Sequence, residues 1–149
     1  MSEPIDDVPE GFVPLVPGGT WLAHAGPIFQ RPAADGGVVI AVRVAQKHTN
    51  IRGIAHGGML VTLADSALGR NIHMTRQPPE PMVSVNLSTD FLGAAKVGDW
   101  LEAHVQVRKH GARLSFAECN LMVGDRVVVR ASGVFAVVGP AGKREVPEG

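Results

Sequence analysis

The feature that most constrains this chain is a run of apolar residues after a pair of glycines. Between Met59 and Leu68 the apolar residues are Met59, Leu60, Val61, Leu63, Ala64, Ala67 and Leu68. Placed on a helix, they cover most of the circumference, whereas a surface helix shows a single apolar stripe. The run therefore predicts a helix that the rest of the protein wraps around.

The polar residues of this run form a narrow stripe on the predicted helix. They are Thr62, Asp65, Ser66 and Gly69, and residues three or four positions apart lie on one helical face. Asp65 is the acid in the stripe, and two interpretations stay open for it. Asp65 is either the solvent-facing acid of an amphipathic helix or a functional residue in an otherwise apolar helix.

The glycines that open the helix favour a site for a negatively charged oxygen. Gly57 and Gly58 let another group approach the backbone closely, and a helix start offers N–H donors at the positive end of its dipole. These parts suit a carbonyl oxygen that becomes negative during acyl transfer. The alternative is a general anion site, which many helix starts provide.

The spacing between the glycines and the acid predicts a site shared by two chains. Gly58 and Asp65 are seven residues apart, which is roughly 10 Å along a helix. A base must come within about 3 Å of its proton, directly or through a water. One helix cannot bring both groups to one carbonyl, but two antiparallel copies can, so we expect a two-fold dimer with two equivalent sites.

The remaining pattern predicts an α+β fold. Residues 38–45 alternate as a strand, and residues 21–30 form a short helix or strand that Gly26-Pro27 interrupts. The long helix ends before Pro78-Pro79, and four strands follow at 82–91, 100–109, 112–123 and 126–138. One antiparallel sheet curled round the helix explains why the helix is apolar on nearly every side.

We expect one domain with two polar ends. Residues 1–18 are acidic and rich in proline and glycine and predict an arm, ordered only where it packs on a neighbour. Residues 19–140 form the domain, and residues 141–149 a polar C-terminal tail. A chain of 149 residues suits one domain with a proper core.

Composition argues against several functional classes. The 14 basic and 14 acidic residues balance, and no basic stripe appears, which argues against nucleic acid as a partner. No apolar run is long enough to cross a membrane, and the N-terminus lacks the features of a signal peptide. The single cysteine, Cys119, lies in a predicted strand as a buried thiol and fits a reducing compartment. The expected location is the cytosol.

Other catalytic motifs are missing from the sequence. The six histidines form no His-x-x-x-His pair and no cluster with cysteine, so no metal site is expected. There is no Gly-x-Ser-x-Gly elbow of a serine hydrolase and no glycine-rich loop that binds phosphate.

Four segments together resemble a known family. They are HTN at 48–50, HGG at 56–58, LADSALG at 63–69 and PMVSVNLSTDFLGAAKVGDWLEAHVQV at 81–107. This pattern resembles the hotdog-fold thioesterases, above all the phenylacetate-pathway thioesterases and a mammalian acyl-CoA thioesterase of similar size, over about residues 45–138. The resemblance implies a hydrolase of acyl- or aryl-CoA thioesters that needs no cofactor. It also implies a homodimer, which often pairs into a tetramer.

The resemblance also implies roles for individual residues. Asp65 is the general base or nucleophile, and the Gly57 N–H binds the thioester carbonyl. Asn50 helps to place the carbonyl or the water, and His56 supports the turn and the substrate. Ser84 matches a serine that assists water placement in one branch of the family. Without the resemblance, His56 is simply a neighbour of the helix start, and Asn50 is a turn residue.

The strand pattern conflicts with the role implied for Ser84. Val83, Val85, Leu87 and Phe91 alternate on one face of the strand at 82–91, so strict alternation puts Ser84 on the opposite, polar face. From there the serine reaches a site only at the strand end or through a subunit contact. Otherwise it is an ordinary solvent-facing serine.

Three basic residues are candidates for binding the phosphates of coenzyme A. Arg108, Lys109 and Arg113 flank the turn at His110-Gly111. The alternative is a solvated hairpin tip, since charged turns are common.

Two rival functions use the same fold. A hotdog hydratase or dehydratase uses a histidine with a second acid or a His-x-Asp pair, which this motif lacks. An acyl-CoA-binding sensor is the other. As part of a repressor it would need a fused DNA-binding module, for which the short N-terminal arm has no room.

Overall fold

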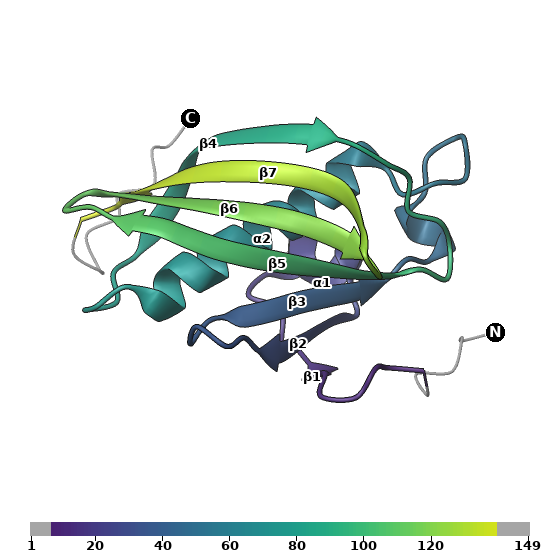
Figure 1. The fold of residues 1–149 in the computed structure, drawn as a ribbon, viewed down its shortest axis with the longest axis horizontal. Helices are drawn as coiled ribbons and strands as arrows, with labels where there is room; N and C mark the ends of the chain where they lie inside the picture. The colour runs from purple at the N-terminus through teal and green to yellow at the C-terminus, as the bar shows by residue number, and fades with distance from the viewer. Residues whose placement is uncertain (1–6, 140–149) are drawn as a thin grey trace.

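The computed structural model describes residues 7–139, which contain one long helix and a curled sheet (Figure 1). The predicted tail at 141–149 and the first six residues of the predicted arm lie outside the described residues. The elements are β1 Val13–Pro14, α1 Thr20–Ala25, β2 Ile28–Pro32, β3 Val38–Arg43, the 3₁₀ turn η1 Gln46–His48, α2 Gly57–Thr75, β4 Met82–Phe91, β5 Trp100–His110, β6 Leu114–Val123 and β7 Arg126–Val137.

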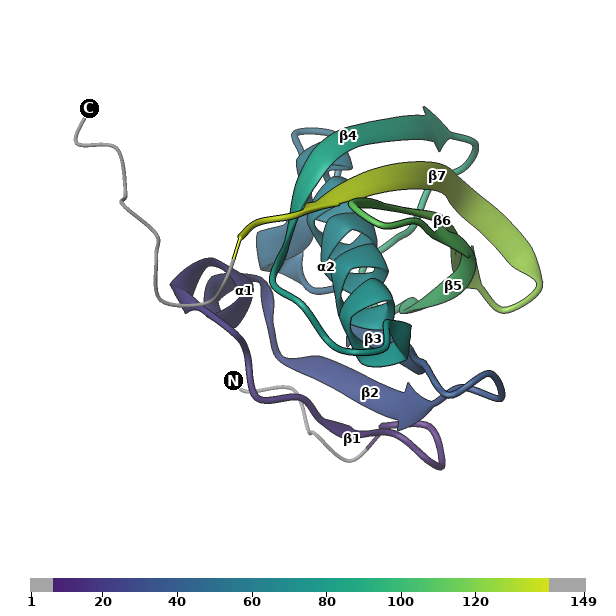
Figure 2. The ribbon, with the colours of Figure 1, turned by 90° about the vertical axis from the view of Figure 1, so that its left-hand side faces the viewer.

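The seven strands form one antiparallel sheet in the order β1-β2-β3-β5-β6-β7-β4. The sheet curls around α2, with β4 and β7 arching over one side of the helix and β2 and β3 beneath the other (Figure 2). The core lies between the helix and the concave face of the sheet. The predicted α+β architecture is confirmed, as are the long helix and the strand at 38–45. The four strands after the helix are confirmed to within a few residues.

Helix α2 forms where the apolar run predicts it. Its sheet side is buried through Leu60, Leu63, Ala64, Ala67, Leu68, Asn71 and Ile72. Full burial of a leucine or isoleucine contributes about 1.5–3 kcal/mol, so this face anchors the helix. The predicted polar stripe lies on the other side and is partly exposed. Within it, Gly69 lies against Phe135 of β7, and Asp65 contacts β4 as described below.

A buried asparagine joins α2 to the start of β3. The Asn71 side chain accepts the Val38 N–H and donates to the Val38 carbonyl, each at 2.9 Å, as a neighbouring strand would. Gly37 makes this approach possible, because a Cβ there would lie 2.0 Å from Asn71 Oδ1. The pair fixes how the helix sits on the sheet.

The sheet extends into the segment that the sequence assigned to the arm. Val13 pairs with Gln30 and Pro14 with Phe29, and Leu15 is buried. This part of the arm therefore packs on its own chain. No sequence pattern predicts this strand, because β1 has only two residues, one of them a proline.

Candidate functional site

The start of α2 is capped by a histidine and leaves backbone donors free. His56 Nδ1 accepts the Gly58 N–H at 2.8 Å, and the His56 carbonyl accepts the Leu60 N–H at 3.1 Å. Within residues 7–139, the N–H groups of Gly57 and Met59 have no hydrogen-bond acceptor. The helix start therefore offers two unpaired donors at its positive end, as an oxyanion site requires.

A second histidine holds this helix start in place. His48 is buried, its Nδ1 accepts the Ala45 N–H at 2.9 Å, and its Nε2–H donates to the Ala25 carbonyl at 2.6 Å. The His48 carbonyl accepts the His56 N–H at 2.7 Å. Burial lowers the pKa of His48, in keeping with a neutral ring that accepts at one nitrogen and donates at the other. In the sequence His48 stands out only as part of the HTN segment. Its hydrogen-bond partners are backbone groups, which a sequence pattern does not show.

Asn50 lies in a tight turn before the helix. Its Oδ1 accepts the Arg52 N–H and its carbonyl accepts the Gly53 N–H, each at 2.9 Å. Gly53 has a positive φ of 75°, which favours glycine at that position of the turn. The structure therefore shows that Asn50 is a turn residue, which was one of its two interpretations from the sequence. The side-chain NH₂ group has no acceptor within the described part of the chain.

Asp65 is held by Ser84 of β4. The Ser84 hydroxyl donates to Asp65 Oδ1 at 2.7 Å. The expectation from strict alternation, that Ser84 faces away from the apolar side, is therefore wrong. The register of β4 against β7 shifts between Ser84 and Asn86, and this bulge reverses the alternation. Val83 and Val85 are left exposed instead, at 37% and 54%.

The second carboxylate oxygen of Asp65 is available for chemistry. No donor among residues 7–139 contacts its Oδ2, and the residue is only partly buried. The serine therefore holds one oxygen, and the other has no partner in the described part of the chain. This arrangement suits a base or nucleophile with a fixed orientation.

One chain does not bring the two halves of the predicted site together. Gly57 and Asp65 are eight residues apart on α2, which is about 12 Å along the helix axis. The structure groups His56 with Gly57 at the helix start, and Asp65 with Ser84 in mid-helix. Within one chain the two groups are therefore too far apart to act on one carbonyl.

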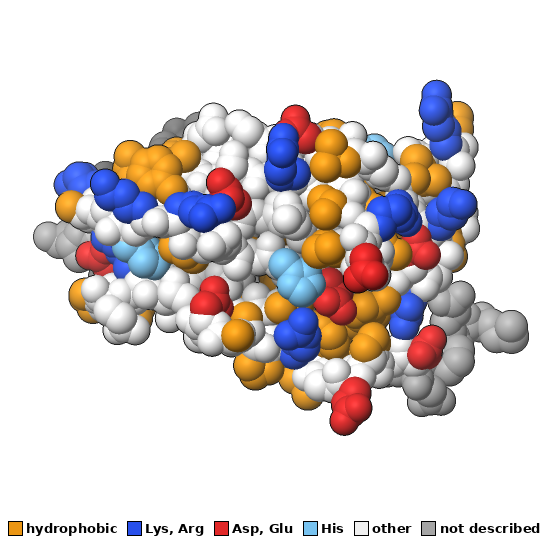
Figure 3. Space-filling view, viewed as in Figure 1, with side chains coloured by type: hydrophobic (Ala, Val, Ile, Leu, Met, Phe, Trp, Pro, Cys, Tyr) orange, Lys and Arg blue, Asp and Glu red, His pale blue; other side chains and the backbone are white. Residues whose placement is uncertain are grey.

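The candidate phosphate ligands lie at the opposite end of α2. Basic side chains gather where β5 passes into β6 (Figure 3). There Arg108 donates twice to Glu118, at 3.0 and 2.6 Å, while Lys109 and Arg113 are exposed and form no ion pair within residues 7–139. Thr75 at the end of α2 contacts His110 of this hairpin at 3.0 Å. In one chain the basic cluster is therefore remote from Gly57.

Two clefts border the exposed side of α2. The smaller, about 440 Å³, is lined by His56, Gly58 and Met59 of the helix start and by residues of α1 and η1. The larger, about 680 Å³, lies along the second half of α2. Trp21 lines both, and its indole N–H donates to Thr62 Oγ1 at 3.2 Å. Space for a ligand thus exists beside the free donors of the helix start.

Other chemistries find no support in the described residues. Residues 7–139 contain no group of three or more His, Cys, Asp or Glu side chains that could hold a metal ion. Cys119 is buried, as predicted, and burial raises the pKa of its thiol to about 12, which leaves it unreactive near neutral pH. No helix in the described part is long and apolar enough to span a bilayer.

Comparison with known proteins identifies the family. The model of the thioesterase superfamily matches residues 52–130. The chain is 50% identical over 129 residues to a Pseudomonas aeruginosa protein named "Putative esterase PA0474", covering 87% of this chain and 96% of that one. It is 32% identical over 96 residues to acyl-coenzyme A thioesterase 13 of Homo sapiens, covering 64% of this chain and 68% of the human one.

Solved structures agree with the sequence comparison. The PaaI protein from the phenylacetic acid degradation operon of E. coli superposes with a TM-score of 0.72 at 25% identity, covering 80% of this chain and 86% of that one. A protein of Streptococcus pneumoniae named "Hypothetical Thioesterase Protein" and solved with coenzyme A gives a TM-score of 0.69 at 26% identity, covering 75% of this chain and 86% of that one. The predicted hotdog fold and the predicted resemblance are confirmed. The chain belongs to the thioesterase superfamily and is a hotdog-fold thioester hydrolase.

Proposed function

We propose that this enzyme hydrolyses acyl- or aryl-CoA thioesters at sites formed between two antiparallel copies of α2. One observation carries the proposal. The unpaired Gly57 N–H and the Ser84-held carboxylate of Asp65 lie about 12 Å apart along one helix. Each is half of an acyl-transfer site, and a two-fold dimer supplies the missing half to each.

The oxyanion half acts on the carbonyl. The Gly57 N–H of one chain donates to the thioester oxygen as negative charge develops, aided by the helix dipole. An oxyanion donor of this kind typically lowers the barrier by about 2.7–4 kcal/mol. His56 keeps the first turn in shape by accepting the Gly58 N–H, and the free amide of Asn50 in the adjacent turn helps to place the carbonyl or the water.

The acid half supplies the attack. Asp65 Oδ2 of the partner takes a proton from water, or attacks the carbonyl carbon to give a mixed anhydride that water then opens. Coenzyme A leaves as the thiol, and the acid is released. Ser84 acts by fixing Oδ1, which keeps the other oxygen aimed at the site.

The exposed surfaces support a second copy of the chain as the partner. β4 lies at one end of the sheet order and pairs only with β7 within residues 7–139, so its other edge is open. An open, partly apolar edge strand is a ready template for pairing with another chain. The exposed Val83 and Val85 lie on it, next to the half-site of Ser84 and Asp65. We propose a homodimer, and a dimer of dimers as the larger assembly.

Coenzyme A as the thiol is supported by the named relatives and by the streptococcal thioesterase solved with coenzyme A. Lys109 and Arg113 are the available phosphate ligands, whereas Arg108 must first leave Glu118. Because the dimer is antiparallel, the hairpin of one chain approaches the partner's helix start. The single thiol, Cys119, fits action in the cytosol.

A thiol-release assay across short-chain, long-chain and aryl acyl-CoAs tests the proposal. We expect release from at least one class, with a loss of about 10²–10⁴-fold in Asp65→Asn, because general-base catalysis is worth about that much. Asp90→Asn is the matched control, since Asp90 is an exposed acid of β4 paired with Arg130. Binding without thiol release would favour a sensor instead. Turnover like wild type in Asp65→Asn would remove Asp65 from the mechanism.

A further inference from the structure

An exposed phenylalanine lies beside the free donor of the helix start. Phe91 is the last residue of β4, and it is 56% exposed. A Cβ on Gly57 would lie 3.4 and 3.5 Å from two carbons of the Phe91 ring. Because Cα–Cβ bonds in a helix tilt toward its N-terminus, the ring borders the space into which the Gly57 N–H points. A ligand that accepts this N–H therefore comes next to an exposed aromatic ring.

The proposed dimer brings Phe91 to the same site by a second route. The open edge of β4 is where a second copy pairs in that dimer. Antiparallel pairing of β4 with its copy sets the end of one strand beside the start of the other. The end of the strand carries Phe91, and its start carries Ser84, which holds Asp65. In the dimer the ring therefore lies between its own chain's oxyanion donor and the partner's base.

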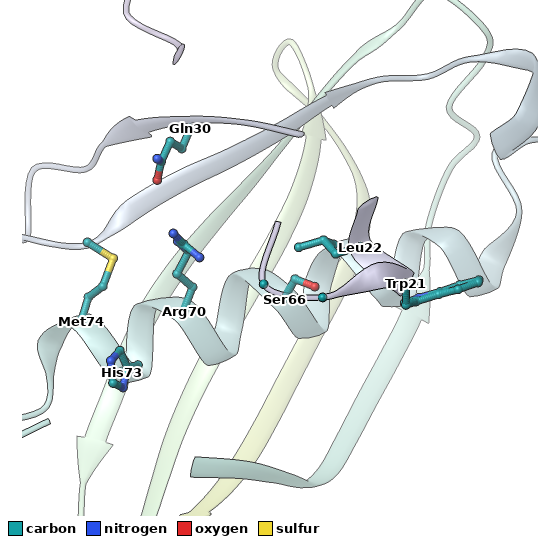
Figure 4. Close-up of a pocket in the computed structure, with 9 residues that line it drawn as sticks. Trp21, Leu22, Gln30, Ser66, Arg70, His73 and Met74 are labelled. Carbon is teal, nitrogen blue, oxygen red and sulfur yellow. The ribbon is translucent and has the colours of Figure 1, made fainter. Parts of the chain in front are cut away.

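The larger cleft lies on a different side of α2. It is bordered by α1, β2 and the second half of α2, and in Figure 4 Arg70 points across it from α2 toward Gln30 of β2. Gly57, Asp65 and Phe91 are not among its lining residues. Asp65 instead contacts Ser84 of β4. A thioester held between the donor and the base is therefore on the β4 side of α2, outside this cleft.

The two surfaces beside the helix start suit the two substituents of a thioester carbonyl. The smaller cleft, which Phe91 does not line, includes His24, Lys47 and Thr49. Such polar groups suit the pantetheine arm, which carries amides and leads to phosphates. On the β4 side the ring of Phe91 is apolar and suits a hydrocarbon. We therefore assign the acyl group to the side of Phe91 and the thiol arm to the smaller cleft.

We propose that Phe91 is a specificity-determining residue that excludes acyl groups branched at the carbon next to the thioester carbonyl. The inference rests on the proposed acyl-CoA hydrolysis and narrows its substrate class. A hydrogen bond from the Gly57 N–H holds the carbonyl oxygen about 2.9 Å from the nitrogen. The neighbouring carbon of the acyl group then comes close to the ring, and a branch on that carbon meets it. A branch at the far end of the chain lies beyond the ring.

Two isomeric substrates test this inference, because they differ only in where the branch lies. We compare kcat/KM for 2-methylhexanoyl-CoA and 5-methylhexanoyl-CoA, each relative to hexanoyl-CoA, in the full-length chain. Phe91→Ala should raise the 2-methyl ratio at least about tenfold, since one methyl group in an apolar pocket is worth about 10–200-fold. The 5-methyl ratio should not change, and Phe91→Leu should give an intermediate 2-methyl ratio. Phe116→Ala, which removes an exposed phenylalanine from the outer face of the sheet, should leave both ratios unchanged.

Three results would overturn the inference while leaving the proposed function standing. The first is an unchanged 2-methyl ratio in Phe91→Ala and Phe91→Leu, with urea unfolding showing that both variants are folded. The second is an equal change in kcat/KM for all three thioesters, which would put the ring beside the pantetheine arm. The third is an equal rise of both ratios, which would show a general widening of the pocket. No thiol release from any substrate would contradict the proposed function, and the inference with it.

Discussion

The two ends of α2 differ in which of their polar groups remain unpaired. At the C-terminal end, Arg76 donates to Glu80, to the carbonyls of Gly111 and Ala112 and to Ser115 Oγ, at 2.7–3.2 Å. In the N-terminal half, the N–H of Gly57 and one oxygen of Asp65 find no partner in the described chain. The polar groups at the C-terminal end are therefore paired within the chain, which makes it the closed end. The N-terminal end leaves polar groups unpaired and is the open end, where a ligand can bind.

This comparison explains why a serine–histidine pair at the closed end is not the active site. His110 Nδ1 lies 2.9 Å from Ser115 Oγ, within the range expected of a base and its nucleophile. But Ser115 is fully buried and also accepts from Arg76, so no substrate reaches it. A serine and a histidine at hydrogen-bond distance therefore mark a catalytic site only where a substrate can reach the serine and the polar groups are not all paired within the chain.

Among the variants of the two helix ends, the largest expected effect comes from removing a single N–H at the N-terminal end. Gly57 is the first residue of α2, where proline is favoured, and His56 before it has the extended backbone that proline requires. Gly57→Pro should therefore preserve the helix and lower kcat about 10²–10³-fold, the loss expected for one oxyanion donor. Steady-state thiol release measures the change.

Gly57→Ala is the matched control, because it adds a side chain but keeps the N–H. Its Cβ would meet Phe91 at 3.4 Å, an ordinary contact, so turnover should stay close to wild type. If the alanine and proline variants lost activity equally, crowding rather than a lost donor would explain both. The oxyanion role of Gly57 would then have to be abandoned.

At the closed end the expected effect is on stability. Arg76→Met leaves two carbonyls and Glu80 without their donor and should lower the free energy of unfolding by about 3 kcal/mol. Urea unfolding measures this, with Arg130→Met as a surface control expected to cost about 0–1 kcal/mol. Turnover per folded molecule should not change. A large loss of kcat in folded Arg76→Met would show that the closed end takes part in catalysis.

The smallest expected effect is on the pH dependence of the free energy of unfolding, to which a histidine near each end of α2 contributes. Burial lowers the pKa of His48, and burial and then the charge of Arg76 lower that of His110. The unfolded chain thus binds more protons, so this stability is present above about pH 6.5 and is lost as the pH falls toward the lowered values. His48→Gln and His110→Gln should each show a shallower decline of unfolding free energy between about pH 7.5 and 5.5. Identical slopes in all three proteins would contradict the assigned protonation states.

The sequence predicted the fold well because its signals are local and periodic. The apolar run predicted α2, and alternation with turn residues predicted the strands after it. A bulge is not periodic, so strict alternation put Ser84 on the wrong face, and the bond to Asp65 appeared only in the structure. Ser84 was nevertheless a candidate, because the family resemblance pointed to it independently of the pattern.

The residues that sequence reasoning missed act through partners far away in the chain. His48 binds the carbonyl of Ala25, Asn71 binds Val38, and Arg76 binds the β5–β6 hairpin. That the Nε of Arg70 is unpaired within the described residues could not be predicted, since a missing partner leaves no trace in a sequence. Which side chains find hydrogen-bond partners far away in the sequence, and which find none, depends on how the sheet curls round the helix. Only the structure shows this.

Mixing two inactive variants tests most directly whether the two halves of the site come from different chains. Chains with Asp65→Asn and chains with Gly57→Pro each lack one half, but a mixed dimer keeps one complete site. After unfolding and refolding an equal mixture, we predict thiol release at about a quarter of the wild-type rate, since half of the dimers are mixed and each holds one of two sites. A mixture no more active than its separate components would contradict the shared site.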